Sequence, residues 1–303
     1  MPRYSNFMLT AIAPIIWGST YYVTTEFLPA GYPLTVAMLR ALPIGLLFLL
    51  VVRQLPSGIW WFRVLLLGGL NFSLFWWMLF ESAYRLPGGI AATVGAIQPL
   101  IVVFLARFLL GSPIRALAIA AAILGLVGVA ILVITPQASL DRLGIAAGMT
   151  GAMSMALGMV LARKWQPPVS LLTFTSWQLV AGGLILLPAS IWFEPPLPEL
   201  TTSNWMGLIY LGAIGAGLTY VLWFRGLSRI EPSAISTLGF FSPLSAVIIG
   251  WLLLDQTLNP MQIGAVFVVF ISVWLSQRAS RTLGDVENSQ PLRKLQPVAE
   301  SCN

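Results

Sequence analysis

The sequence predicts an all-α integral membrane protein of ten transmembrane helices, arranged as two inverted five-helix repeats around a central cavity. Three observations lead to this prediction: the composition, the spacing of apolar runs and an internal repeat. The chain has 303 residues, of which 58% are hydrophobic and only 9% are charged. The surface of a soluble protein of this length carries far more charge.

The apolar runs of about 15 to 23 residues are long enough to cross a hydrocarbon core of about 30 Å at 1.5 Å per residue. We expect spans at 7–23, 33–52, 61–80, 89–110, 114–134, 143–161, 170–192, 205–224, 232–254 and 261–275. The first run carries Pro14 and Trp17 and more spans follow it, so we do not expect a cleaved signal peptide. The polar segment after 275 is expected to be disordered.

The basic residues gather on alternate connections. Thirteen of the 16 would lie on one side of the membrane: Arg3, Arg53, Arg63, Arg107, Arg115, Arg163, Lys164, Arg225, Arg229, Arg278, Arg281, Arg293 and Lys294. The positive-inside rule therefore predicts a multi-pass protein of the cell (inner) membrane with both termini in the cytoplasm. Because this topology accounts for the net charge of +6, we expect no nucleic-acid partner.

The second five spans repeat the first five. An offset of 144 residues aligns Trp61 with Trp205 and Gly68 with Gly212, and an offset of 138 aligns Gly45 with Gly183 upstream. The proline-rich stretch 194–200 accounts for the difference between the two offsets. We expect repeats at 1–137 and 138–277 and a disordered cytoplasmic tail at 278–303. Since five is odd, the second repeat is inverted, which is the architecture of secondary transporters.

The same offset pairs a glycine and a proline near the middle of spans four and nine, "GAIQPL" and "GFFSPL". Pro99 and Pro243 each remove a backbone donor and leave the carbonyls of Gly95 and Gly239 without it. At membrane depth such carbonyls are tolerated against protein or a water-filled cavity. We expect these four residues to kink or gate the helices around the cavity; the alternative is a purely structural kink.

These two segments, together with "IIWGSTY" in the first span and "AMLRAL" in the second, resemble the duplicated EamA module of the drug/metabolite transporter superfamily. The resemblance covers the chain up to its tail. It implies ten helices in inverted repeats and a plasma-membrane carrier of small metabolites, often an exporter of amino acids. The chain departs from the family pattern at Ser112 and Gln256, where the family has glutamate.

We expect the cavity to be lined by polar and aromatic residues of spans one, three, four, eight and nine. They are Trp17, Ser19, Asn71, Phe75, Trp76, Thr93, Gln98, Thr219, Tyr220, Trp223, Thr237 and Ser242. Trp76 and Tyr220 are equivalent in the two repeats, so inversion would place them on opposite sides of the midplane, as gates or as walls for an apolar side chain. Packing between helices and the interfacial aromatic belt are the alternatives.

Arg40 is the eighth residue of its span and so lies roughly 10 Å deep. A charge at this depth costs on the order of 3 kcal/mol and should face the protein or snorkel. Glu81, at the end of the third span, is its expected partner. The pair could contact a substrate carboxylate, form an outer gate, or be a structural ion pair.

The sequence favours a secondary transporter, an exporter of small organic metabolites such as amino acids, including apolar and aromatic ones, that works by alternating access. A carrier of phosphorylated or nucleotide-type metabolites is the alternative, although it would need several deep cations. An enzyme is disfavoured, because the chain has no histidine and no evident nucleophile–base cluster. We expect a small-molecule substrate and the lipid bilayer as partners, no cofactor and no metal; the oligomeric state stays open and is compatible with a monomer.

Overall fold

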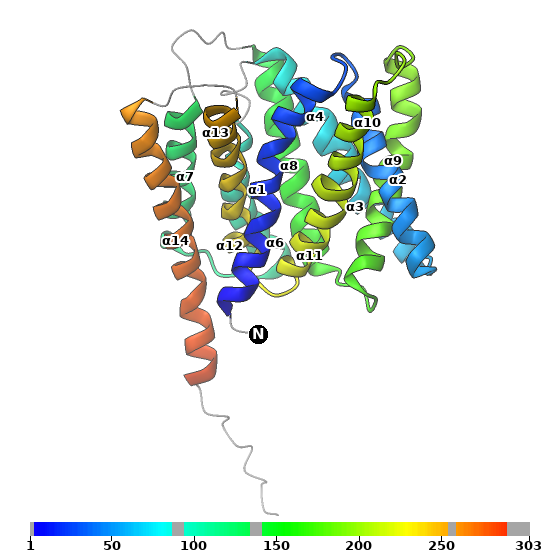
Figure 1. Ribbon diagram of the computed structural model, residues 1–303. Helices are drawn as coiled ribbons and strands as arrows, with labels where there is room; N and C mark the ends of the chain where they lie inside the picture. The colour runs from blue at the N-terminus through cyan, green and yellow to red at the C-terminus, as the bar shows by residue number, and fades with distance from the viewer. Residues whose placement is uncertain (1–2, 87–93, 134–140, 254–258, 290–303) are drawn as a thin grey trace, which may run out of the picture.

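The computed structural model describes residues 3–86, 94–133, 141–253 and 259–289, and within these ranges the regular structure is entirely helical. The helices lie side by side with roughly aligned axes (Figure 1). The first residues of α1 and the last residues of α14 lie at the same end of the bundle (Figure 1).

The segments of the first half are α1 (Arg3–Phe27), α2 (Pro33–Val52), α3 (Trp60–Gly68), η1 (Gly69–Leu74), α4 (Phe75–Arg85), α6 (Gln98–Leu110) and α7 (Ala116–Val133). Those of the second half are α8 (Arg142–Lys164), α9 (Leu171–Phe193), α10 (Thr202–Ile209), η2 (Tyr210–Leu218), α11 (Thr219–Leu227), α12 (Pro232–Ser236), η3 (Thr237–Phe240), α13 (Phe241–Leu253) and α14 (Pro260–Ser289). η1 and η2 are π-helical, and η3 is a 3₁₀ turn.

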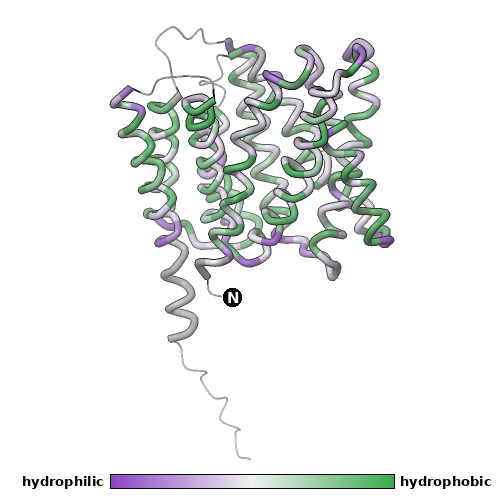
Figure 2. Tube along the Cα trace, viewed as in Figure 1, coloured by the Kyte–Doolittle hydropathy of each residue, from purple (hydrophilic) through white to green (hydrophobic). Residues whose placement is uncertain are grey.

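Seven stretches are long and apolar enough to cross a membrane: Pro33–Val52, Trp60–Ser82, Arg142–Lys164, Leu171–Phe193, Thr202–Leu227, Pro232–Leu253 and Pro260–Ala279. α6 and α7 are shorter apolar helices. Hydrophobic residues fill the middle of the bundle and hydrophilic ones gather at its ends (Figure 2). The protein is therefore a multi-pass membrane protein.

Hydrogen bonds from side chains define several helix starts. Asp141 accepts the Gly144 N–H at 2.7 Å, and Ser170 accepts the Thr173 N–H at 3.1 Å. α6 ends at Gly111, whose φ of +71° favours glycine. The first-turn donors of a helix lack partners within the helix, so these residues fix the helix ends that the hydropathy pattern leaves loose.

The third and eighth spans each contain a π-helical stretch in their middle. Displaced by the 144-residue offset, η1 falls on 213–218, inside η2. The sequence predicted two uninterrupted helices here. π-helical turns shift the regular backbone pairing and occur often at functional sites, and both stretches are rich in glycine.

The fourth and ninth spans are discontinuous rather than kinked at their prolines. Helix geometry at Val94 and Gly95 gives way to a turn, and α6 starts anew at Gln98 with Pro99 as its second residue. In the ninth span the 3₁₀ turn η3 precedes α13, whose third residue is Pro243. Each proline thus lies in the first turn of a new helix, where a missing N–H costs little.

Contacts between the halves join equivalent helices in equivalent ways. α2 packs on α9 and α7 on α14, while α1 packs on α13 and α11 as α8 does on α6 and α4. A Cβ on Gly45 would lie 2.8 Å from the Val180 nitrogen, and one on Gly183 would lie 2.6 Å from the Leu42 Cβ. Both members of each contact are 138 residues apart. Small residues let membrane helices approach this closely.

The structure corrects the predicted tail. α14 continues to Ser289, so residues 278–289, predicted as disordered, are helical. The stretch has no proline, and extending an existing helix is far easier than starting one. The rest of the predicted tail lies outside the described residues.

Candidate functional site

Seven aromatic side chains meet in the middle of the bundle and are called here the central aromatic cluster: Trp17, Phe72, Trp76, Phe174, Tyr220, Trp223 and Phe224. Tyr220 is its centre, with ring centroids 5.1 Å from Trp17, 4.5 Å from Phe72, 6.2 Å from Trp76 and 5.9 Å from Phe224. Trp17 also lies 5.0 Å from Trp223. These distances are typical of favourable ring pairs.

The contact between Trp76 and Tyr220 corrects one expectation. The sequence predicted two aromatic positions on opposite sides of the midplane, serving as separate gates. Instead the two rings meet edge to face. Both halves contribute to a single cluster, because the equivalent positions lie near the plane that relates them.

A chain of hydrogen bonds runs from the cluster to a buried cation. Trp17 Nε1 donates to Thr219 Oγ1 at 2.9 Å, and Thr219 Oγ1 donates to the Gly215 carbonyl at 2.9 Å. Arg40 Nη2 donates to the same carbonyl at 2.6 Å. The acceptor lies in the π-helical stretch η2, so the irregular backbone anchors side chains from two other helices.

Arg40 is 6% exposed and is the one buried basic side chain in the part of the chain that the structure describes. Its guanidinium carbon lies 4.7 Å from the centre of the Trp76 ring, a cation–π contact. The expected pairing with Glu81 is wrong: Glu81 accepts from Arg85 Nε at 2.5 Å. Residues four apart on one helix meet without tertiary packing.

A second polar contact joins η1 to α9. Asn71 Nδ2 donates to Gln178 Oε1 at 2.9 Å, and neither residue is exposed. Asn71 Oδ1 has no hydrogen-bond partner, and neither does Nε1 of Trp223, which is 2% exposed. Buried polar groups without partners are uncommon and costly. These two atoms are therefore candidates for binding a ligand's polar groups beside the aromatic rings.

The remaining candidates lie around the discontinuous spans. A Cβ on Gly95 or Gly239 would meet nothing within 4 Å, so both equivalent glycines face open space. Gln98 and Ser242 are half-buried, and the Ser242 carbonyl lies close to Gly18 of α1. Thr93 lies outside the described residues.

Three predicted lining residues have other neighbours. Thr237 is buried and donates to the Ala234 carbonyl within its own turn at 3.0 Å. Ser19 and the Tyr210 hydroxyl share a hydrogen bond of 2.7 Å between α1 and η2. Phe75 is half-buried and packs against the main core.

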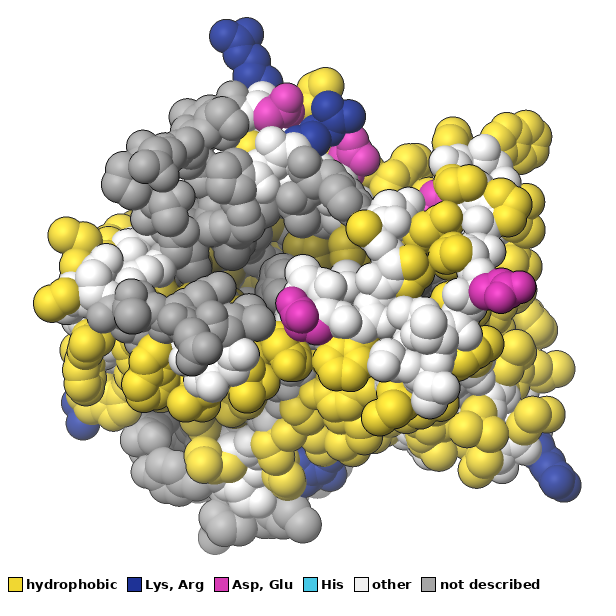
Figure 3. Space-filling view, turned by 45° about the horizontal axis from the view of Figure 1, so that its top comes forward, with side chains coloured by type: hydrophobic (Ala, Val, Ile, Leu, Met, Phe, Trp, Pro, Cys, Tyr) yellow, Lys and Arg dark blue, Asp and Glu magenta, His cyan; other side chains and the backbone are white. Residues whose placement is uncertain are grey.

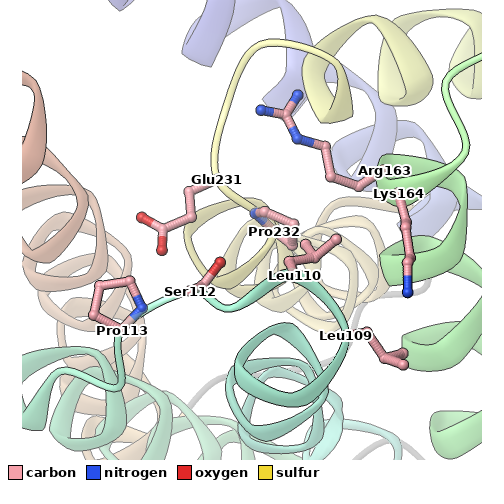
Figure 4. Close-up of a pocket in the computed structure, with 8 residues that line it drawn as sticks. All are labelled: Leu109, Leu110, Ser112, Pro113, Arg163, Lys164, Glu231 and Pro232. Carbon is pink, nitrogen blue, oxygen red and sulfur yellow. The ribbon is translucent and has the colours of Figure 1, made fainter.

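Two pockets open at the end of the bundle where α1 starts. The larger, about 570 Å³, lies between the ends of α6 and α8 and the start of α12, and Arg163, Lys164 and Glu231 line it (Figure 4). The smaller, about 190 Å³, reaches Phe174 and Phe224 of the central aromatic cluster. The opposite end shows acidic and uncharged polar side chains, with hydrophobic ones covering the flanks (Figure 3).

Sequence reasoning did not identify Phe72, Phe174 or Phe224 of the cluster, nor the Gly215 carbonyl. Gln178 was noted as the repeat equivalent of Arg40, which was a signal that it also faces the interior. No residue-type pattern marks a backbone carbonyl as an acceptor.

The family model of the EamA-like transporter family matches residues 5–134 and again residues 142–277. Protein PecM of Dickeya dadantii is 42% identical over 292 residues, which cover 95% of each chain. The WAT1-related protein At3g02690, chloroplastic, of Arabidopsis thaliana is 29% identical over 279 residues, or 86% of this chain and 66% of that protein.

The uncharacterized inner membrane transporter YedA of Escherichia coli K12 is 28% identical over 267 residues, covering 86% of this chain and 87% of that one. One solved crystal structure matches 91% of this chain and 99% of its own chain with a TM-score of 0.77 at 20% identity, a likeness of fold. With its two matches to one family model, the chain belongs to the EamA-like transporter family, within the drug/metabolite transporter superfamily.

Proposed function

We propose that this transporter exports small organic metabolites such as amino acids, including apolar and aromatic ones. The observation that carries the proposal is the central aromatic cluster, together with the unpartnered Nε1 of Trp223 and Oδ1 of Asn71. Sites for small molecules combine apolar and aromatic walls with a few polar groups. The cluster would hold an apolar side chain, and the two polar atoms would orient the polar part of the substrate.

The proposed mechanism is alternating access between two inverted repeats, 1–137 and 138–277, with ten spans in all. Equivalent close contacts such as Gly45 with Val180 and Gly183 with Leu42 support this arrangement. The equivalent π-helical stretches and discontinuous spans support it further, because broken helices near the midplane are typical of such carriers. We place Gly95, Pro99, Gly239 and Pro243 at the moving segments.

The proposed location is the cell (inner) membrane with both termini in the cytoplasm. The basic connections support it through the positive-inside rule. The ends of α1 and α14 lie at the same end of the bundle (Figure 1), as this topology requires.

Phosphorylated or nucleotide-type substrates form the second candidate, which the site supports less well. Multiply charged anions need several cations, and Arg40 is the one buried basic residue among those described. A single guanidinium suits one carboxylate better.

Counterflow into proteoliposomes tests the choice with a panel of amino acids, purines and sugar phosphates. We expect amino acids with apolar or aromatic side chains to exchange fastest. Exchange of sugar phosphates in preference to amino acids would contradict the proposal. Trp223→Phe removes the unpartnered N–H and keeps an aromatic ring, so it should weaken substrate binding with little change in folding.

A further inference from the structure

The larger pocket lies where three helices converge. Leu109 and Leu110 come from the last turn of α6, Arg163 and Lys164 from the last turn of α8, and Pro232 from the first turn of α12. α6, α8 and α12 contact one another, and α6 and α12 belong to the two discontinuous spans. The pocket therefore opens between the two halves, at the outer ends of the broken helices.

The walls combine aliphatic surface with charge. Figure 4 shows Leu109 and Leu110 facing the pocket from one helix, with Arg163 and Lys164 on another and Glu231 across from them. The volume of about 570 Å³ is within the range of small-molecule sites. Such a lining suits a molecule with an apolar body and a charged group.

The balance of charge favours an anionic group. Glu231 is already paired, since Arg115 Nη1 donates to its carboxylate at 3.1 Å. Arg163 Nη1 donates to the Leu227 carbonyl at 2.8 Å, which orients the guanidinium at the end of α11. A guanidinium has five N–H donors, so this bond uses one of them. Arg163 and Lys164 thus supply positive charge that the one lining acid, held by Arg115, does not cancel.

We propose that this pocket is the mouth of the transport path at the basic end of the molecule. Arg163 and Lys164 bind the carboxylate of a small amphiphilic substrate there, and the leucine and proline walls hold its apolar part. The inference rests on the proposed function and adds an encounter site to it, separate from the central aromatic cluster. Positive charge at a cleft raises the local concentration of an anionic group.

A thiol at the pocket wall reports occupancy without transport. Cys302 is the single cysteine, so Cys302→Ser combined with Ser112→Cys places one thiol beside the lining charges. The purified full chain in neutral detergent is labelled with a maleimide, with or without L-phenylalanine. We expect L-phenylalanine to slow labelling at least about threefold, and L-phenylalaninamide, which lacks the carboxylate, to leave the rate unchanged.

Charge variants identify the residues responsible. Arg163→Gln with Lys164→Gln should abolish protection, and Arg163→Lys should retain it. Arg107→Gln is the matched control, because Arg107 is an exposed cation in the last turn of α6 that does not line the pocket. Size-exclusion chromatography of each variant verifies folding.

Equal protection by L-phenylalaninamide, or full protection in the double glutamine variant, would overturn the inference. Protection by inorganic phosphate without protection by L-phenylalanine would also overturn it and would assign the pocket to a phosphate or lipid headgroup. Counterflow without protection contradicts the encounter site alone. Protection without counterflow of any amino acid contradicts the proposed export alone.

Discussion

Two polar contacts occupy equivalent places in the two halves and differ in chemistry. Between α2 and η2, the Arg40 guanidinium donates to the Gly215 carbonyl; between α9 and η1, Asn71 donates to Gln178. Arg40 and Gln178 are 138 residues apart, and Asn71 and Gly215 are 144 apart. The repeat has kept the positions of both contacts, while the residues have diverged.

The difference teaches which feature belongs to the scaffold and which to a specialised site. Each contact ties a π-helical stretch to a helix of the other half. Neutral amides do this at modest cost, whereas a buried guanidinium is expensive to place in a membrane. Retaining the charge in one half alone therefore points to a role beyond packing, in keeping with a carboxylate-binding function for Arg40.

Gln178→Arg should produce the largest effect, since it makes the neutral contact cationic. Gln178 is fully buried and a second guanidinium would lie opposite the Asn71 side-chain amide, at a cost of about 3 kcal/mol or more. We expect little folded protein by fluorescence-detected size-exclusion chromatography. Gln166→Arg, at an exposed glutamine beyond α8, is the control and should accumulate normally. Normal yield of both would mean that the two halves tolerate charge alike.

Gly45→Ala and Gly183→Ala test whether the scaffold contacts are equal in strength. Each new Cβ would lie under 3.0 Å from atoms of the opposite helix, so we expect each variant to lose about 1–3 kcal/mol in stability. Thermal unfolding in detergent measures both. Gly264→Ala meets nothing within 4 Å and should be neutral or slightly stabilising. A loss in one half only would show that the crossing is supported unequally.

Arg40→Gln makes the charged contact resemble its neutral equivalent. The Gly215 carbonyl keeps its bond from Thr219, so the stability loss should stay near 1 kcal/mol. Counterflow of amino acids should fall about tenfold if the guanidinium binds the carboxylate, because charge-assisted bonds are about twice as strong as neutral ones. A decarboxylated amine analogue provides the reference. Unchanged amino-acid counterflow at equal reconstitution would leave Arg40 with a structural role.

Trp223→Phe should have the smallest effect on stability, since it removes a donor that has no partner. Its equivalent in the first half is Leu79, so the N–H exists on one side alone. We expect a lower apparent affinity in counterflow with an unfolding temperature within a few degrees of the parent. Trp17→Phe, which breaks the bond to Thr219, should lower that temperature more. The reverse order of the two temperatures would exclude this account of Trp223.

Much of the fold was open to prediction from the chain alone. The second span was predicted at 33–52, where α2 lies, and the ninth at 232–254, where α12 to α13 lie. Runs of apolar residues mark membrane helices without reference to other contacts. Trp17, Tyr220 and Trp223, chosen for type and depth, do meet in the structure.

The partners of individual side chains were not predictable in the same way. Glu81 was assigned to Arg40 from depth, but the rotation of the helices directs Arg40 to Gly215 instead. Helical periodicity states which residues share a face and not which faces of separate helices meet. A π-helical turn also shifts the residues that follow it, and no residue pattern announced η1 or η2.

The sequence by itself determined the membrane-embedded helical class, the duplication and the side on which basic residues gather, because each depends on composition and order along the chain. The tertiary structure alone decided that aromatic rings from both halves form one cluster and that a buried guanidinium meets a backbone carbonyl. It also decided that a charged pocket opens between the broken helices. These depend on how close-packed helices rotate against one another, and that rotation is set by many small contacts distributed over the whole chain.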